Sequence, residues 1–360
     1  LDRVEASVLK ELVNGWPVLG PALLITLKIA CLALLAVEAT PAHAQSARRT
    51  DVQSDSQDAL TDAMYATPNP YKTAPLDNLY ATAPGLEQQI ARPQVRLNAL
   101  VPYGWNSNAD EVRYNGLRTM EWRPNGSVSV ATPLGETWVR ATVSAFAETD
   151  RFARSWELNR DKAGGSFRLQ VVNPGDDQFF SPFFSFAPRW DFQPTFDTRL
   201  SIRQDYNVGL NKRINFDGDL RPIGPAGDTS AATFLSFGLT AFVQRRERWP
   251  QTSSNALFVI PSASLSFTRN LSATLSLEYI ARWFDRNKDG FRARESEIQP
   301  IATISFVIPS EWLGGERIAE ILGHPTLNLQ GSYLKAWSNV PDGGFAQWKG
   351  VSALRFGWTF

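Results

Sequence analysis

The chain has 360 residues, with 36 basic residues balanced by 36 acidic ones, and it contains a single cysteine. This balance argues against a nucleic-acid partner, because such proteins usually carry a basic surplus. The one cysteine excludes an intrachain disulfide and any metal site built from several cysteines. The mean hydropathy of −0.24 would suit a soluble protein, but membrane barrels have similar averages because only alternate residues face lipid.

Residues 1–44 have the pattern of a secretory signal peptide. Lys28 precedes the apolar run Ile29–Val37, and Ala42–Ala44 supply the small residues of a cleavage site. We therefore expect cleavage after Ala44, which would also remove the only cysteine. The alternative is an uncleaved anchor helix over Val18–Val37, but this helix would place Lys28 in mid-membrane, where a charge is costly.

Residues 45–94 are polar and rich in turn-forming residues, with little hydrophobic periodicity. This composition is typical of a flexible linker. We expect a flexible periplasmic arm, and the sequence leaves open whether it plugs a barrel, tethers a periplasmic partner or does neither.

From Val95 onward the hydrophobic period changes to two, which is typical of strands with one apolar face. Residues 95–360 are thus predicted to form an all-β, transmembrane, antiparallel β-barrel of about twelve strands. An even number of strands lets both termini of the chain lie on one side of the membrane. The predicted strands are 95–105, 117–131, 137–149, 165–173, 179–187, 197–214, 233–246, 256–269, 271–284, 296–308, 326–338 and 347–360.

The connections between these strands suggest an orientation. If the chain ends at the periplasmic rim, long polar connections face outward, at 106–116, 150–164, 188–196, 246–255, 285–295 and 339–346. The inner turns are mostly short, but 215–232 and 309–325 are long, and the latter contains a short helical pattern that stops at Gly323.

Tryptophans lie at or near the predicted strand ends, where interfacial girdles of a membrane barrel would place them. They are Trp105, Trp122, Trp138, Trp190, Trp283, Trp337, Trp348 and Trp358. The alternative fold is a soluble β-sandwich, which would bury its apolar faces in one core and gives no reason for tryptophan at both ends of its strands.

The final strand places Leu354, Phe356, Trp358 and Phe360 on one face. An aromatic C-terminal residue on an alternating strand resembles the assembly signal of Gram-negative outer-membrane β-barrel proteins. The resemblance implies recognition by the barrel-assembly machinery and a location among outer-membrane lipid. It concerns the topology of residues 95–360 and names no specific family.

The polar faces of the predicted strands give a set of inward-facing charges in which arginine outnumbers the carboxylates. The set is Arg96, Arg140, Glu148, Arg168, Arg199, Arg203, Asp205, Arg213, Glu278, Arg282 and Arg355. In a water-filled pore such a ring favours anions. In a narrow barrel the same residues would form ion pairs that brace the wall, and a twelve-stranded barrel lies between the filled and the open sizes.

Two functions therefore remain open from the sequence. The first is a channel or export pore for small polar, anionic solutes, whose anion preference would fall when Arg203 and Arg282 are neutralised. The second is a non-transporting surface barrel: an adhesin, a receptor or an envelope-stabilising protein.

An enzyme is not favoured. His43 leaves with the signal peptide, and His324 lies in a predicted periplasmic connection, whereas outer-membrane hydrolases commonly place the histidine at the outer rim. A hydrolase that used Glu148, Asp205 and Glu278 gains no support from their spacing. We expect no cofactor.

One stretch resembles a metal-binding loop. Asp285, Asn287 and Asp289, followed by Gly290, match the first half of a calcium loop, but Ser296 occupies the position of the closing bidentate Glu. We therefore favour a polar surface loop without a metal.

Overall fold

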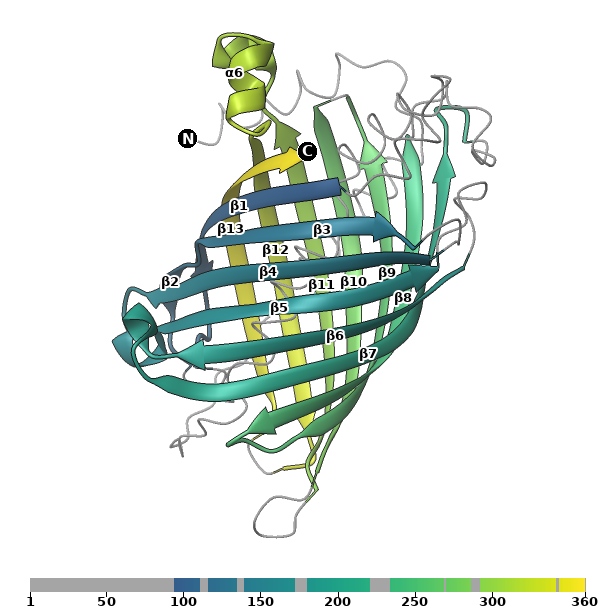
Figure 1. The fold of residues 1–360 in the computed structure, drawn as a ribbon. Helices are drawn as coiled ribbons and strands as arrows, with labels where there is room; N and C mark the ends of the chain where they lie inside the picture. The colour runs from purple at the N-terminus through teal and green to yellow at the C-terminus, as the bar shows by residue number, and fades with distance from the viewer. Residues whose placement is uncertain are drawn as a thin grey trace, which may run out of the picture. The chain divides into compact units, whose positions relative to one another are not determined.

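The computed structural model describes residues 94–110, 116–134, 139–171, 180–220, 234–268, 270–285, 292–340 and 343–359. The predicted signal peptide lies outside these ranges, as does the predicted arm except for Gln94, so both stay predictions. The described residues form one antiparallel sheet that closes on itself as a twelve-stranded barrel (Figure 1), which confirms the predicted fold class. No helix within the described ranges is long and apolar enough to cross a membrane.

The strands follow one another around the wall in chain order, and β13 pairs with β1 to close it. They are β1 (Gln94–Asn106), β2 (Thr119–Trp122), β3 (Asn125–Pro133), β4 (Val139–Phe152), β5 (Arg160–Val171), β6 (Ser181–Phe192), β7 (Arg199–Phe216), β8 (Leu235–Trp249), β9 (Ser254–Ser266), β10 (Leu271–Phe284), β11 (Arg294–Val307), β12 (Thr326–Ser338) and β13 (Phe345–Thr359).

Strands β2 and β3 make a single span, because both pair with β1 and β4 in one continuous register. The ladder is interrupted at Arg123 and Pro124. Proline has no N–H to donate to a neighbouring strand, so Pro124 breaks the pairing. The N–H of Arg123 still donates to the carbonyl of Pro102, at 3.2 Å, which holds the two halves in line.

The outward face of the wall is apolar and exposed. Val143, Val208 and Ile304 are 55%, 63% and 50% exposed, and in water such a surface would be unfavourable by about 25 cal/mol for each Å². Tryptophans on this face form a row near the rim opposite the C-terminus, as in an interfacial girdle. They are Trp105, Trp122, Trp190, Trp249, Trp283 and Trp337, each between 37% and 62% exposed.

The two ends of the barrel differ, and we name them here. The C-terminal rim is the end at which β13 finishes, and the opposite rim carries the connections 107–118, 153–159, 193–198, 250–253, 285–293 and 339–344. The two longest connections, 217–234 and 308–325, lie at the C-terminal rim, where the sequence already placed two exceptions to the expected length asymmetry. Most connections at the opposite rim are shorter than predicted because the strands run further into it: β5 starts at Arg160 and β6 continues to Phe192.

The described parts of the connections contain four short helical segments. They are η1 (Trp156–Leu158), η2 (Pro194–Phe196), η3 (Ser310–Leu313) and α6 (Glu316–Ile321). The helical pattern predicted before Gly323 is confirmed by α6, and Gly323 follows it with a φ of 68°, a left-handed conformation that favours glycine.

On the inner face of the wall, a row of aromatic rings extends across β6, β8 and β9. Phe242 stacks on Phe258 with ring centroids 4.4 Å apart, and it also meets Phe183 at 6.1 Å. Gly209 on β7 lies between Phe183 and Phe242 in the register, so its missing side chain lets the two rings meet across the strand.

We expect Gly209→Ala to destabilise the barrel by about 1–3 kcal/mol, because a Cβ there would overpack the wall. This atom would lie 2.3 Å from both the Ala241 carbonyl oxygen and the Phe242 Cβ. The matched control is Gly331→Ala, where a Cβ would meet nothing within 4 Å. Urea unfolding of both variants in detergent micelles measures the difference, and equal free energies of unfolding would contradict the packing argument.

Candidate functional site: the charged barrel interior

The interior of the half nearest the opposite rim is lined by a dense set of charged side chains, here called the ion-pair layer. Each member is only 1–8% exposed. The members are Glu121, Arg123, Glu148, Asp150, Lys162, Arg189, Asp191, Arg203, Asp205, Arg246, Glu278, Arg282, Glu295, Glu297 and Lys349.

One group in this layer joins the β2–β3 span to β4 and β5. Lys162 Nζ lies 3.0 Å from Glu148 Oε1 and 2.7 Å from Asp150 Oδ2. Arg123 contacts Asp150, with Nε 3.5 Å from Oδ1, and Glu121, with Nη2 3.3 Å from Oε2. The alternating signs tie three neighbouring spans together through side chains as well as through the backbone ladder.

A second group joins β7 to β8. Asp205 accepts from Arg203 Nε at 2.7 Å through Oδ2, and from Arg246 Nε at 3.0 Å through Oδ1. The carboxylate thus lies between two guanidinium groups, and Asp205 is 4% exposed. Buried charges are tolerated when each one is paired in this way.

Further pairs continue the layer around the wall. Arg189 Nε lies 2.9 Å from Asp191 Oδ1, and the Ser201 hydroxyl also donates to Asp191. Arg282 on β10 reaches Glu297 on β11, with Nη1 3.4 Å from Oε1. The layer therefore extends over most of the circumference.

The other half of the interior has a different character, and we call its basic residues the arginine zone. They are Arg96, Arg140, Arg168, Arg213 and Arg355, all exposed or half-buried. On the strand segments that the structure describes in this half, the inward positions carry no Asp or Glu. Most are Ser, Thr, Asn or Gly.

The contacts of the arginine zone include several neutral groups. The Arg168 guanidinium lies over the Phe183 ring, 4.0 Å from its centroid. Arg213 Nη2 donates to the Ser236 hydroxyl, and Arg355 Nη2 donates to the Asn98 side-chain oxygen, both at 3.3 Å. Such groups orient a guanidinium without neutralising its charge.

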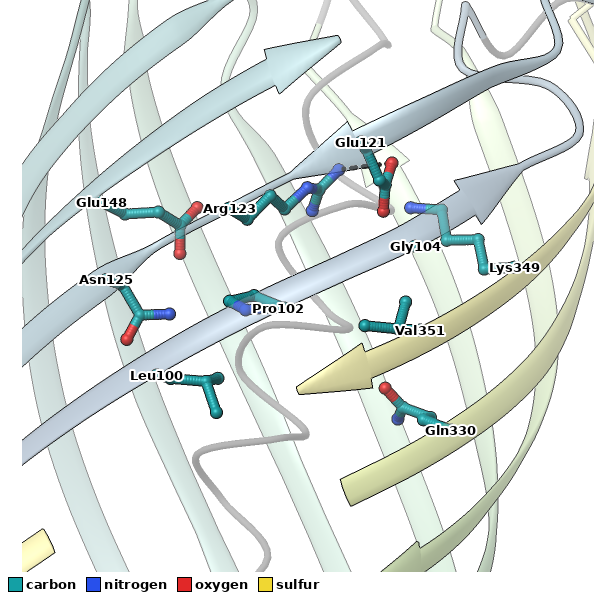
Figure 2. Close-up of a pocket in the computed structure, with 10 residues that line it drawn as sticks. All are labelled: Leu100, Pro102, Gly104, Glu121, Arg123, Asn125, Glu148, Gln330, Lys349 and Val351. Atoms are coloured by element: carbon teal, nitrogen blue, oxygen red, sulfur yellow. Dashed lines mark hydrogen bonds and ion pairs between the residues drawn. The ribbon is translucent and has the colours of Figure 1, made fainter. Parts of the chain in front are cut away.

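A small hollow with a cavity volume of about 30 Å³, partly open to solvent, lies against the inner face of β1 (Figure 2). Small or apolar residues form part of its lining, and four charged members of the ion-pair layer lie along one side of it. Figure 2 shows Arg123 between Glu121 and Glu148, with Lys349 directed toward Glu121. The lining residues are Leu100, Pro102, Gly104, Glu121, Arg123, Asn125, Glu148, Gln330, Lys349 and Val351.

The residues singled out from the sequence fall into three groups. Glu148, Arg203, Asp205, Glu278 and Arg282 lie in the ion-pair layer, and the arginine zone holds Arg96, Arg140, Arg168, Arg213 and Arg355. Arg199 lies apart, exposed at the start of β7 beside a register shift. Several members of the layer were not foreseen, among them Asp150, Lys162, Arg189, Asp191 and Arg246.

The remaining candidates lie away from the interior. Asp285 accepts two hydrogen bonds from the Arg245 guanidinium, at 3.1 and 2.9 Å, whereas Asn287 and Asp289 lie outside the described residues. No group of three or more His, Cys, Asp and Glu within the described ranges is arranged to hold a metal ion. His324 follows α6 at the C-terminal rim with a φ of 46°, and His43 lies outside the described residues.

The closing strand presents its large apolar residues outward. Leu354, Phe356 and Trp358 pair with Val101, Ala99 and Leu97 on β1, so they share the face of the exposed Val101 and Leu97. Phe360, the fourth residue of the predicted assembly signal, lies outside the described residues.

The chain is similar in fold to several proteins of known structure. It is similar to the translocator domain of the autotransporter NalP from Neisseria meningitidis, with 11% identity over 85% of this chain and 98% of that chain and a TM-score of 0.39. It is also similar to an outer membrane channel from Pseudomonas putida F1, with 8% identity over 74% and 95% of the two chains and a TM-score of 0.43. LpxR from Salmonella typhimurium gives 7% identity over 72% and 99%, with a TM-score of 0.35.

No family model matches the chain, and no curated protein matches it. The likeness to solved structures is one of barrel architecture. The closed wall and its apolar outer face make the protein a β-barrel of the outer-membrane type, and its specific family is not identified.

Proposed function

We propose that the protein is an outer-membrane channel for small polar, anionic solutes. The observation that carries this proposal is the arginine zone: on the described strands of this half, the inward positions carry five Arg and no Asp or Glu. A ring of basic side chains in a wet lumen raises the local concentration of anions and lowers that of cations.

The direction in which solutes enter follows from the topology. Because the number of spans is even, the first span starts and the last span ends at the C-terminal rim. In bacterial outer-membrane barrels this rim faces the periplasm. The arginine zone would then collect anions from the periplasm. The ion-pair layer would form the constriction toward the outside, so we expect a small conductance.

The second candidate is a non-transporting barrel, and the ion-pair layer favours it. Side chains that line a wide, water-filled pore stay hydrated, whereas Asp150 is 2% exposed and Arg282 is 1% exposed. A continuous layer of this kind would brace the wall and close the lumen, leaving the connections at the opposite rim to bind a ligand.

Single-channel recording of the folded protein in planar bilayers distinguishes the two candidates. A channel gives discrete current steps, and an anion-selective one gives a reversal potential displaced toward that of chloride in a salt gradient. A folded protein that passes no current would contradict the channel and support the bracing barrel.

Neutralising Arg203 and Arg282, which the sequence suggested as the test of selectivity, is a poor choice in the light of the structure. Both residues pair with buried carboxylates of the ion-pair layer, Asp205 and Glu297. Removing either guanidinium would leave a buried acid without one of its partners, so a change in current could reflect a disturbed wall.

A further inference from the structure

The connection between β11 and β12 folds back against the outer face of the barrel. Trp312 in η3 packs on Phe306, with ring centroids 5.6 Å apart. Phe306 pairs with Leu271 and Leu327, and Leu327 is an exposed, outward-facing residue of the wall. The connection is therefore continuous with the surface that meets lipid.

The end of this connection is fixed to the closing strand. The Trp358 indole N–H donates to the Ile321 carbonyl at 2.9 Å, and the Gly357 N–H donates to the Gly323 carbonyl at 2.8 Å. A Cβ on Gly323 would lie 2.7 Å from the Trp358 ring, so only glycine allows this approach. Figure 1 shows α6 beside the C-terminal end of β13.

The connection exposes large apolar side chains instead of burying them. Trp312 is 73% exposed and Ile321 is 66% exposed, while Ile318 and Leu322 are 43% and 37% exposed. Ile318, Ile321 and Leu322 have the spacing i, i+3 and i+4, which places them on one side of the helix.

The other sides of α6 have different surroundings. Ala319 is 1% exposed, and Glu316, Arg317 and Glu320 are exposed to solvent. A helix of this length is not stable by itself in water, so its exposed apolar side needs a partner.

We propose that residues 309–323, which we call the rim anchor, insert Trp312, Ile318, Ile321 and Leu322 into the phospholipid surface beside the closing strand β13. The occupant is lipid because the rim anchor extends a wall that already meets lipid and is held against it by Phe306 and Trp358. Tryptophan and aliphatic residues opposite a charged side are typical of segments that lie in a membrane interface. The charged side would remain in water.

Nitroxide labels test this proposal in the full chain with Cys31→Ser, reconstituted in phospholipid vesicles. Labels at Ile321→Cys and Trp312→Cys report the apolar side, and a label at Glu320→Cys, one residue away on the charged side, is the matched control. Oxygen concentrates in lipid and a nickel chelate stays in water. The collision rate of the label with oxygen, divided by its collision rate with the nickel chelate, is therefore expected to be several-fold higher at positions 321 and 312 than at 320.

Two results would overturn the proposal. Equal ratios at positions 320 and 321 would show that the rim anchor stands in water. Exclusion of both reagents at position 321, with spin–spin broadening that grows with protein density, would show that a second copy of the chain covers it. The outcome does not depend on whether the barrel conducts.

Discussion

Replacement of Asp205 by Ala is expected to lower the free energy of unfolding by about 3–5 kcal/mol, since it leaves buried charges without their partner. Arg203 and Arg246 both donate to this carboxylate, and they are 3% exposed each. Urea unfolding in micelles, followed by the heat-dependent migration of the barrel on gels, measures this loss.

The matched control is Asp285→Ala, which removes another Arg–Asp contact in the same protein. Arg245 and Asp285 form a two-hydrogen-bond pair, but their side chains are 37% and 44% exposed. Water replaces an exposed partner, so the cost should be about 0–1 kcal/mol. Equal losses for the two variants would show that the ion-pair layer is as hydrated as the surface.

If the protein is the proposed anion channel, replacement of Arg140, Arg168 and Arg213 together by Gln is expected to lower its chloride-to-potassium permeability ratio several-fold. These residues supply basic charge to a stretch of lumen in which the inward positions of the described strands include no Asp or Glu. The reversal potential in a salt gradient measures the ratio, and the unfolding transition checks that the barrel is intact.

Lys212→Gln is the control for selectivity, because it removes a positive charge one residue from Arg213 but on the outward face. The Lys212 ammonium lies over the Phe180 ring, 4.1 Å from its centroid, away from the lumen. Its permeability ratio should match that of the unaltered protein. An unchanged ratio in the triple variant would mean that the arginine zone does not set selectivity.

The alternation of apolar and polar residues was sufficient to predict the architecture. It gave twelve spans, and the structure confirms this number once β2 and β3 are counted as one. The extra strand boundary comes from Pro124, whose missing N–H interrupts hydrogen bonding without changing the register. A single-residue break of this kind does not alter the period on which the prediction rests.

The strand ends near the opposite rim were predicted less well, and the ion-pair layer explains the difference. Lys162, Arg189 and Asp191 were assigned to polar connections because charged residues usually mark loops. They lie on strands, where buried partners from neighbouring strands satisfy their charges. Continuing the two-residue period from Glu148 to Asp150 would have placed Asp150 inside, but its partners depend on pairing across the sheet.

The division of the interior into two zones also depended on the folded register. The inward-facing arginines were identified from the sequence, but Arg203 and Arg168 looked equivalent there. Arg203 shares Asp205 with Arg246 from the next strand, while Arg168 lies over an aromatic ring. Contacts between residues about 40 positions apart are set by how far each strand is shifted against its neighbour, which alternation alone does not specify.

One half of the interior is expected to be an anion-attracting, wet lumen, and the other half is expected to be closed by paired charges. Charged thiol reagents of opposite sign test it directly on single cysteines at Asn211, Ser201 and Leu210 in a Cys31→Ser chain. Asn211→Cys, in the same half of the lumen as the arginine zone, should react faster with the anionic reagent than with the cationic one. Ser201→Cys, beside the ion-pair layer, should react slowly with both reagents. Leu210→Cys, which faces lipid, should react with neither. Equal rates for the two reagents at position 211, or fast reaction at position 201, would contradict the claim.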